Sequence, residues 1–224
     1  MNRNTTIGLC LILMGISLMA MVSHFRSDEN ESGFTEQELA LLHRADSIMR
    51  VLTIDDPQDS LTLRSDCRDF SSEALLSDEF ASLSELMIAT VTHPSQDGVG
   101  IAGPQVGLSR RVVAVQRFDK EGEPFEVYPN ICIVWKSDSL EFGPEGCLSV
   151  PDRREDVARS QKIVIEYTDI YSHCEAHSGH DSELGSCTAD CKLAQVRDTI
   201  SGFTAVIFQH EVDHLDGILY IDRL

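Results

Sequence analysis

Hydrophobic and polar positions along the chain separate helical stretches from strand-like runs. Apolar residues recur at helical spacing in three stretches, which cover residues 36–53, 78–93 and 202–215. Between the last two lie three runs rich in β-branched and aromatic residues, namely 111–118, 125–135 and 162–168. Pro94 and Gly217 follow two of the helical stretches and act as stop signals. Strands that cluster between early and late helices predict an α+β fold.

A continuous apolar run precedes this pattern. Residues 5–23 are 19 consecutive uncharged residues, which is long enough to cross a bilayer and also close to a secretory signal. We expect residues 1–25 to direct the chain to a membrane, as an uncleaved anchor or, slightly less favoured, as a cleaved signal. Arg3 precedes the run and Arg26 follows it, so the charge rule does not set the side on which the domain lies.

Charge restricts the partners that the chain can bind. Of 224 residues, 37 are acidic and 18 are basic, which gives a net charge of −19. Binding to nucleic-acid phosphates or to anionic lipids needs a basic surface, so this composition argues against nucleic acid, including ribosomal RNA, as a partner. A hydrophobic fraction of 42% at this length predicts one globular domain with a sizeable core.

The strongest chemical signal is the sequence H-E-V-D-H at residues 210–214, within the last helical stretch. Histidines four residues apart project from one face of a helix, so His210 and His214 can bind one metal ion. Glu211 can then contact a water on that ion without being a ligand. The alternative is a pair of core histidines hydrogen-bonded to Asp213. We favour the metal because this spacing seldom arises by chance among only eight histidines.

A third metal ligand is expected upstream of the histidine pair. Catalytic metals usually have three protein ligands and one position open to water, and only ten residues follow His214. Cys147, in the sequence E-G-C-L-S at 145–149, is the best candidate. A cysteine taken alone is more often a small buried hydrophobic residue. Gly146 beside it and the need for a third ligand favour a thiolate that binds the metal.

The glycine-rich segment 98–105 is the third candidate element. It has no strand before it and no Lys-Ser/Thr ending, so it does not resemble a phosphate-binding loop. Beside a metal, a glycine-rich backbone would allow an extended substrate to approach closely. The amide of Gln105 would then donate a hydrogen bond to a developing oxyanion. Taken alone, an ordinary glycine loop with a surface glutamine is the simpler interpretation.

Together the three segments resemble one family, the peptide deformylases. Its members carry a G-x-G-x-A-[AG]-P-Q segment, an E-G-C-L-S segment and an H-E-x-D-H helix in this order, and Gly103 stands here where alanine is commoner. The resemblance covers residues 49–224, preceded by a polar linker and N-terminal helix at 26–48. It implies an α+β fold in which antiparallel sheets surround a central helix with the H-E-x-x-H motif.

The resemblance also implies an activity and its catalytic residues. The protein would be a metal-dependent hydrolase that removes the formyl group from N-formylmethionyl peptides and releases formate. The metal ligands would be Cys147, His210 and His214, with Fe(II) as the native metal and Zn(II) as a usual substitute. Glu211 would be the general base. Gln105 and the backbone N–H of Leu148 would help the metal to hold the oxyanion.

Further residues would bind the peptide or support the metal loop. Val99 and Gly100 would pair with the substrate as an added strand. The pocket for the methionine side chain would be formed by Phe203, Val206 and Ile207. Structural support would come from Asp213 and from a buried pair between Glu145 and Arg159, which would hold the loop of the cysteine ligand.

Two features depart from the family. Cytoplasmic members often carry a basic C-terminal helix that docks on the ribosome, whereas here the residues 222–224 and the charge of −19 argue against docking. A Cys/His-rich insertion spans about residues 171–197. One disulfide among Cys174, Cys187 and Cys191 is our first hypothesis for it, ahead of a second metal site and of a solvated loop with free thiols.

The apolar leader and the insertion suggest export, whereas deformylation of new proteins takes place in the cytoplasm. One interpretation is a working deformylase that is tethered to the bacterial inner membrane or acts in the periplasm. The other is a metal-bound protein without deformylase activity, either a formyl-peptide binder or a peptidase. The presence of Glu211 and Gln105 favours catalysis, because a binder needs no base. A simple H-E-x-x-H protease ranks third, because no downstream ligand is available.

Overall fold

The computed structural model describes residues 33–170 and 193–224. The apolar run 5–23 and the cysteines at 174, 187 and 191 lie outside these residues, so the expectations about them stay predictions. Across the two described ranges, the structure contains no helix that combines the length and the apolar character needed to cross a membrane.

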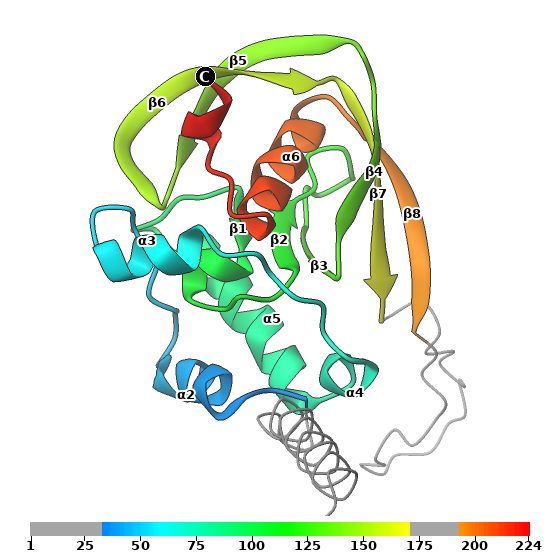
Figure 1. Ribbon diagram of the computed structural model, residues 1–224. Helices are drawn as coiled ribbons and strands as arrows, with labels where there is room; N and C mark the ends of the chain where they lie inside the picture. The colour runs from blue at the N-terminus through cyan, green and yellow to red at the C-terminus, as the bar shows by residue number, and fades with distance from the viewer. Residues whose placement is uncertain (1–32, 171–192) are drawn as a thin grey trace, which may run out of the picture.

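The described chain folds into antiparallel sheets and helices (Figure 1). The helices are α2 (Glu36–Arg44), α3 (Pro57–Leu63), α4 (Ser72–Leu75), α5 (Asp78–Val91), η1 (Gly103–Val106), α6 (Phe203–Leu215) and η2 (Tyr220–Arg223). The strands are β1 (Gly100–Ala102), β2 (Val112–Gln116), β3 (Phe125–Pro129), β4 (Cys132–Lys136), β5 (Leu140–Cys147), β6 (Val150–Ser160), β7 (Lys162–Asp169) and β8 (Ala194–Ser201).

Helix α6 occupies the centre of this arrangement. Two three-stranded sheets, β1-β2-β3 and β4-β7-β8, pack against it, and the two-stranded hairpin β5–β6 arches across it (Figure 1). All strand pairs are antiparallel. The prediction of an α+β fold around a central H-E-x-x-H helix is therefore confirmed. Burial explains the central position of the helix, because Ile207, Phe208 and Leu215 join the core formed by both sheets.

The first helical stretch is shorter than its apolar spacing predicts. Helix α2 starts with a capping box between Thr35 and Glu38 and ends at Arg44, not at residue 53. Beyond it, the backbone N–H of Met49 donates to Thr90 Oγ1 (2.8 Å) and that of Leu52 donates to the carbonyl of Gln105 (2.8 Å). The chain here binds α5 and η1, so its apolar residues serve tertiary packing and not a helix of their own.

The strand-like run 125–135 is two strands in two different sheets. Asn130 separates β3 from β4 with a left-handed backbone (φ 54°), which asparagine tolerates better than most residues. Its side chain accepts a hydrogen bond from the N–H of Phe70 (2.7 Å) and donates one to the carbonyl of the same residue (3.1 Å). At the end of the predicted insertion, β8 already begins at Ala194, so residues 194–197 belong to a sheet.

A buried ion pair fixes the N-terminal helix to the rest of the domain. Arg110 is 1% exposed and donates from Nε to Glu38 Oε1 (2.7 Å) and from Nη2 to Oε2 (3.0 Å). Burial raises the pKa of the Glu38 carboxyl, but the hydrogen bonds from Arg110 and from the Thr35 backbone prevail and hold it below its ordinary value. The charged form of Glu38 therefore stabilises the folded state.

Glu38→Gln is expected to lower the free energy of unfolding at pH 7 by about 2 kcal/mol, because a hydrogen bond to a charged group is lost beside a buried arginine. Since the pKa of Glu38 is depressed in the folded state, this contribution is present above the unfolded value of 4.5 and is lost as pH falls through the folded value. Urea unfolding should show that the difference in the free energy of unfolding between wild type and variant becomes smaller from pH 7 to pH 3. The control is Glu36→Gln, which changes an exposed acid. A difference in the free energy of unfolding that does not depend on pH would contradict the stabilising role of the charged Glu38.

Candidate metal centre

Three side chains from two elements meet at one point. The sulfur of Cys147 and ring nitrogens of His210 and His214 lie within 4.8 Å of one another, and Cys147 Sγ is 3.2 Å from His214 Nε2. Cys147 ends strand β5, while the two histidines occupy successive turns of α6. One thiolate and two imidazoles are donors that suit zinc or iron. The structure thus brings together the three residues predicted as ligands.

The surroundings orient His210 and favour positive charge beside it. His210 Nδ1 donates to Glu145 Oε2 (2.8 Å), which leaves Nε2 as the nitrogen free to bind a metal. Burial lowers the pKa of His210, but the contacts with Cys147 and Glu145 prevail and raise it to about 10. A buried position that stabilises a cation between a sulfur and a carboxylate suits a divalent metal ion.

Glu211 lies beside these donors without joining them. It is 4% exposed, and its Oε2 atom has no hydrogen-bond partner in the described part of the chain. Burial raises the pKa of this carboxyl to about 7. An unpartnered buried carboxylate next to three donors fits a site that binds a water or an ion, because buried polar atoms are otherwise almost always paired.

Gly100 makes room for this carboxylate. A Cβ atom at this position would lie 2.5 Å from Glu211 Oε1 and 2.9 Å from two further atoms of the same side chain. Strand β1 can therefore approach α6 only because residue 100 has no side chain. The backbone of the glycine segment and the acid of the H-E-x-x-H motif are in direct contact.

Gly100→Ala is expected to displace the Glu211 carboxylate and to lower by about 10²-fold the kcat of a reaction in which this acid takes part, since a shift of about 1 Å in a catalytic group has that effect. Gly143→Ala is the matched control, because a Cβ there meets no atom within 4 Å. Steady-state rates of both metal-loaded variants are the measurement. A Gly100→Ala enzyme as fast as Gly143→Ala would mean that Glu211 does not need its present position.

A buried ion network supports the ligands from behind. Arg159 donates to Glu145 through Nε (2.7 Å) and Nη2 (2.9 Å), which is the predicted pair, and its Nη1 also donates to Asp213 Oδ2 (2.6 Å). Asp213 further accepts two hydrogen bonds from Arg223. The alternative in which Asp213 binds the two histidines is therefore wrong, because two guanidinium groups take up its oxygens. Sequence reasoning missed Arg223, which no local motif marks.

Gln105 is not a surface residue of a glycine loop. It is 1% exposed, and its Oε1 accepts a hydrogen bond from the N–H of Ala102 (2.8 Å). This bond orients Nε2 towards the metal centre, 3.5 Å from Cys147 Sγ and 3.3 Å from Ser149 Oγ. Ser149 is fully buried and was not singled out in the sequence, although it belongs to the E-G-C-L-S segment.

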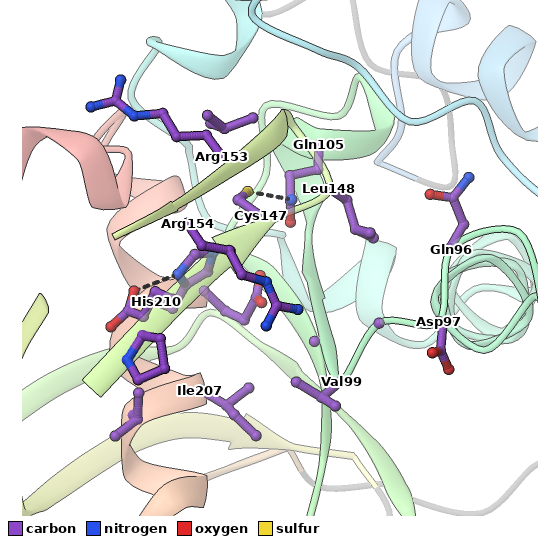
Figure 2. A pocket seen from close by; sticks show the side chains of 18 of the residues that line it. Gln96, Asp97, Val99, Gln105, Cys147, Leu148, Arg153, Arg154, Ile207 and His210 are labelled. Carbon is purple, nitrogen blue, oxygen red and sulfur yellow. Dashed lines mark hydrogen bonds and ion pairs between the residues drawn. The ribbon is translucent and has the colours of Figure 1, made fainter. Parts of the chain in front are cut away.

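An open pocket of 660 Å³ leads to the metal centre. All five predicted substrate-binding residues line it: Val99, Gly100, Phe203, Val206 and Ile207. Leu148, Gln105 and Glu211 line it as well, and Figure 2 shows Cys147, Gln105 and His210 converging on one part of it. Strand β1 lies at the edge of its sheet, where an extended peptide can add as a strand.

The pocket also differs from expectation in two respects. Of the residues predicted to form the methionine pocket, Ile207 is buried, but Phe203 is 58% exposed. Phe203 lies at the first turn of α6, where it contacts only the ring of Phe118 (centroids 5.3 Å apart) among the described aromatic residues. Polar residues that sequence reasoning did not select line the pocket too, namely Gln96, Asp97, Asp152, Arg153 and Arg154.

A central H-E-x-x-H helix, an upstream cysteine sulfur, a buried acid and an apolar pocket beside an edge strand define a metal-dependent hydrolase of peptide-like substrates. Residues 48–182 and 187–224 match the family model described as polypeptide deformylase. The chain belongs to the polypeptide deformylase family.

Individual relatives agree with this assignment. The chain is 31% identical to a peptide deformylase of Leptospira biflexa over 186 residues, which are 80% of this chain and 88% of the relative. A peptide deformylase of Pseudothermotoga lettingae is 34% identical over 142 residues, which are 63% of this chain. The match covers 64% of that protein, which is less than two thirds of its length. The Met-Ala-Ser bound structure of a class I type b peptide deformylase from Acinetobacter baumannii superposes with a TM-score of 0.61 at 30% identity, covering 80% of this chain and 100% of that one.

Proposed function

We propose that the protein removes the formyl group from N-formylmethionyl peptides and releases formate and a peptide with a free amino terminus. The observation that carries this proposal is the buried, unpartnered Glu211 carboxylate beside the Cys147, His210 and His214 donors. Family membership supports it. A solved relative binds Met-Ala-Ser, which has the form of the peptide product of such a reaction.

The donor set fits the metal that this chemistry requires. We propose Fe(II) as the native ion and Zn(II) or another divalent ion as a substitute, held by Cys147 and both histidines. When bound, such an ion lowers the pKa of a water and polarises the formyl carbonyl. Cys147 and His210 line the open pocket, so substrate and water reach these donors.

The residues of the chain would supply the proton transfers and the orientation. Glu211 accepts a proton from the attacking water and later donates it to the leaving amine, and a pKa near 7 suits both steps. Gln105 Nε2, fixed by the bond from Ala102, donates to the developing oxyanion together with the backbone N–H of Leu148. Preorganised donors of this kind stabilise a transition state without a reorganisation cost.

The substrate would bind along β1, the edge strand of its sheet. Val99 and Gly100 offer backbone hydrogen bonds to the peptide, and Val206 and Ile207 with Phe203 at the rim offer an apolar site for the methionine side chain. A substrate that lies along β1 presents its blocked amino terminus to Glu211, which contacts Gly100. Specificity for a terminal formyl group would follow from this alignment.

Location and partners are proposals of the same kind. The uncharged run 5–23 supports attachment to a bacterial inner membrane or export to the periplasm, and the net charge of −19 supports an enzyme that does not dock on the ribosome. The alternative function is a metal-bound formyl-peptide binder or a peptidase. The buried Glu211 supports catalysis over binding. Burying an unpartnered acid lowers the stability of the fold, and a protein that only binds peptides has no use for such an acid.

The full chain, loaded anaerobically with Fe(II), should release formate from formyl-Met-Ala-Ser. Acetyl-Met-Ala-Ser is the control substrate, and metal analysis confirms loading. Formate release from the formyl peptide establishes the deformylase activity. Binding of the peptide to metal-loaded protein without release would identify a binder, and cleavage of the Met–Ala bond would identify a peptidase.

A further inference from the structure

A line of alternating charges leads from the metal centre to helix η2. Glu145 accepts hydrogen bonds from His210 and Arg159, and Arg159 also donates to Asp213. Both oxygens of Asp213 then accept from Arg223, Oδ1 from Nη2 (2.6 Å) and Oδ2 from Nε (3.0 Å). The side chains of the two acids and of Arg159 are at most 6% exposed, whereas that of Arg223 is 39% exposed.

Arg223 adds a second guanidinium to this line. Glu145 and Asp213 are two buried carboxylates, and Arg159 is one guanidinium between them. Without Arg223, Asp213 would lose two hydrogen-bond donors, and both acids would compete for those of Arg159. Arg223 binds Asp213 with two donors, so Arg159 can give two of its own donors to Glu145.

Helix η2 reaches His210 by a second contact. The ring of Tyr220 stacks on the ring of His210 with centroids 5.9 Å apart and planes inclined by 25°. Tyr220 is 1% exposed, and its hydroxyl donates to the carbonyl of Arg153 on β6 (2.8 Å). The helix that carries Arg223 is thus held against the hairpin and against the histidine ligand.

We infer that Arg223 is a positioning residue for the metal centre, acting through Asp213, Arg159 and Glu145 on His210. The inference rests on the proposed metal site. Glu145 fixes the ring of His210 through Nδ1, and partners of this kind around a metal ligand typically contribute 10- to 100-fold in affinity. Loss of Arg223 lets Asp213 draw Arg159 away from Glu145, which releases the ring.

The test uses the full chain and Co(II), whose visible absorption reports ligand geometry. Arg223→Met should raise the Kd for Co(II), measured by competition with a chelator, by about 10-fold and should shift the absorption bands. Arg223→Lys keeps the charge but not the paired hydrogen bonds, so its Kd should lie between wild type and Arg223→Met. Thermal unfolding is measured for every variant to confirm that it is folded.

Arg64→Met is the matched control. Arg64 binds Asp222 on the same short helix but has no bond to Asp213, so its removal loosens η2 without breaking the line of charges. A Kd and a spectrum close to wild type for Arg64→Met, with the changes above for Arg223→Met, support the inference. Equal losses in both variants, or an Arg223→Met protein that binds Co(II) as wild type does, overturn it. Wild type is titrated first, and a wild-type protein that binds no Co(II) overturns the proposed metal site as well.

Discussion

Glu211→Gln should lower the rate of formate release by about 10²–10⁴-fold, the range that general acid–base catalysis contributes. The amide has the size of the carboxylate but cannot accept and return a proton. Glu211 is not one of the three clustered donors, so the variant should retain its metal. Single-substrate kinetics of Fe(II)-loaded protein, with metal content measured on the same samples, test both statements.

The control for this variant is Glu141→Gln, which changes an exposed acid on the β5–β6 hairpin and should leave the rate unchanged. It excludes an effect of net charge on a strongly acidic protein. A Glu211→Gln protein with normal turnover would remove the base from the mechanism. Loss of metal from that variant would instead show that Glu211 contributes to metal binding.

Arg159→Met should have the largest effect on stability. It leaves two buried carboxylates, Glu145 and Asp213, without the guanidinium that they share. Removing one partner from a buried ion pair costs about 3–5 kcal/mol, which corresponds to a fall in Tm of roughly 10 °C for a domain of this size. Chemical and thermal unfolding of the metal-free protein are the measurements, so that metal binding does not contribute.

Arg153→Met provides the comparison on the same strand. Arg153 is exposed and pairs through Nε with Glu155 (3.0 Å), and exposed pairs contribute at most about 1 kcal/mol. The two variants remove the same chemical group from β6 and differ in burial. An Arg159→Met protein as stable as Arg153→Met would show that the buried network adds nothing to stability.

The sequence predicted those parts of the centre that depend on local spacing. The i, i+4 relation of His210 and His214 requires only a helix, and the need for a third donor upstream selected Cys147. The long apolar helices α5 and α6 were also predictable, because α5 buries one face over several turns and α6 buries almost all of its side chains. The spacing of apolar residues in a sequence indicates which side chains are buried, and both helices lie in the core.

Elements without a buried face were not predictable in this way. The hairpin β5–β6 carries Cys147 and Arg159, yet most of its side chains are exposed and its sequence shows no alternation. Its two strands are held together by hydrogen bonds to each other, and the sequence of one strand alone does not reveal this pairing. The bonds of Asp213 to two arginines likewise depend on the tertiary fold, so no local pattern selects Arg223.

The burial of the cysteines has a consequence for oxidation chemistry. Among the described residues, burial raises the pKa of Cys67 to about 12 and also raises that of Cys132, so both sulfurs stay protonated and poorly reactive at neutral pH. Cys147 instead lines the open pocket. An oxidant small enough to enter this pocket therefore reaches the one sulfur among these three that the proposed metal needs, and a bound ion or peptide would shield it.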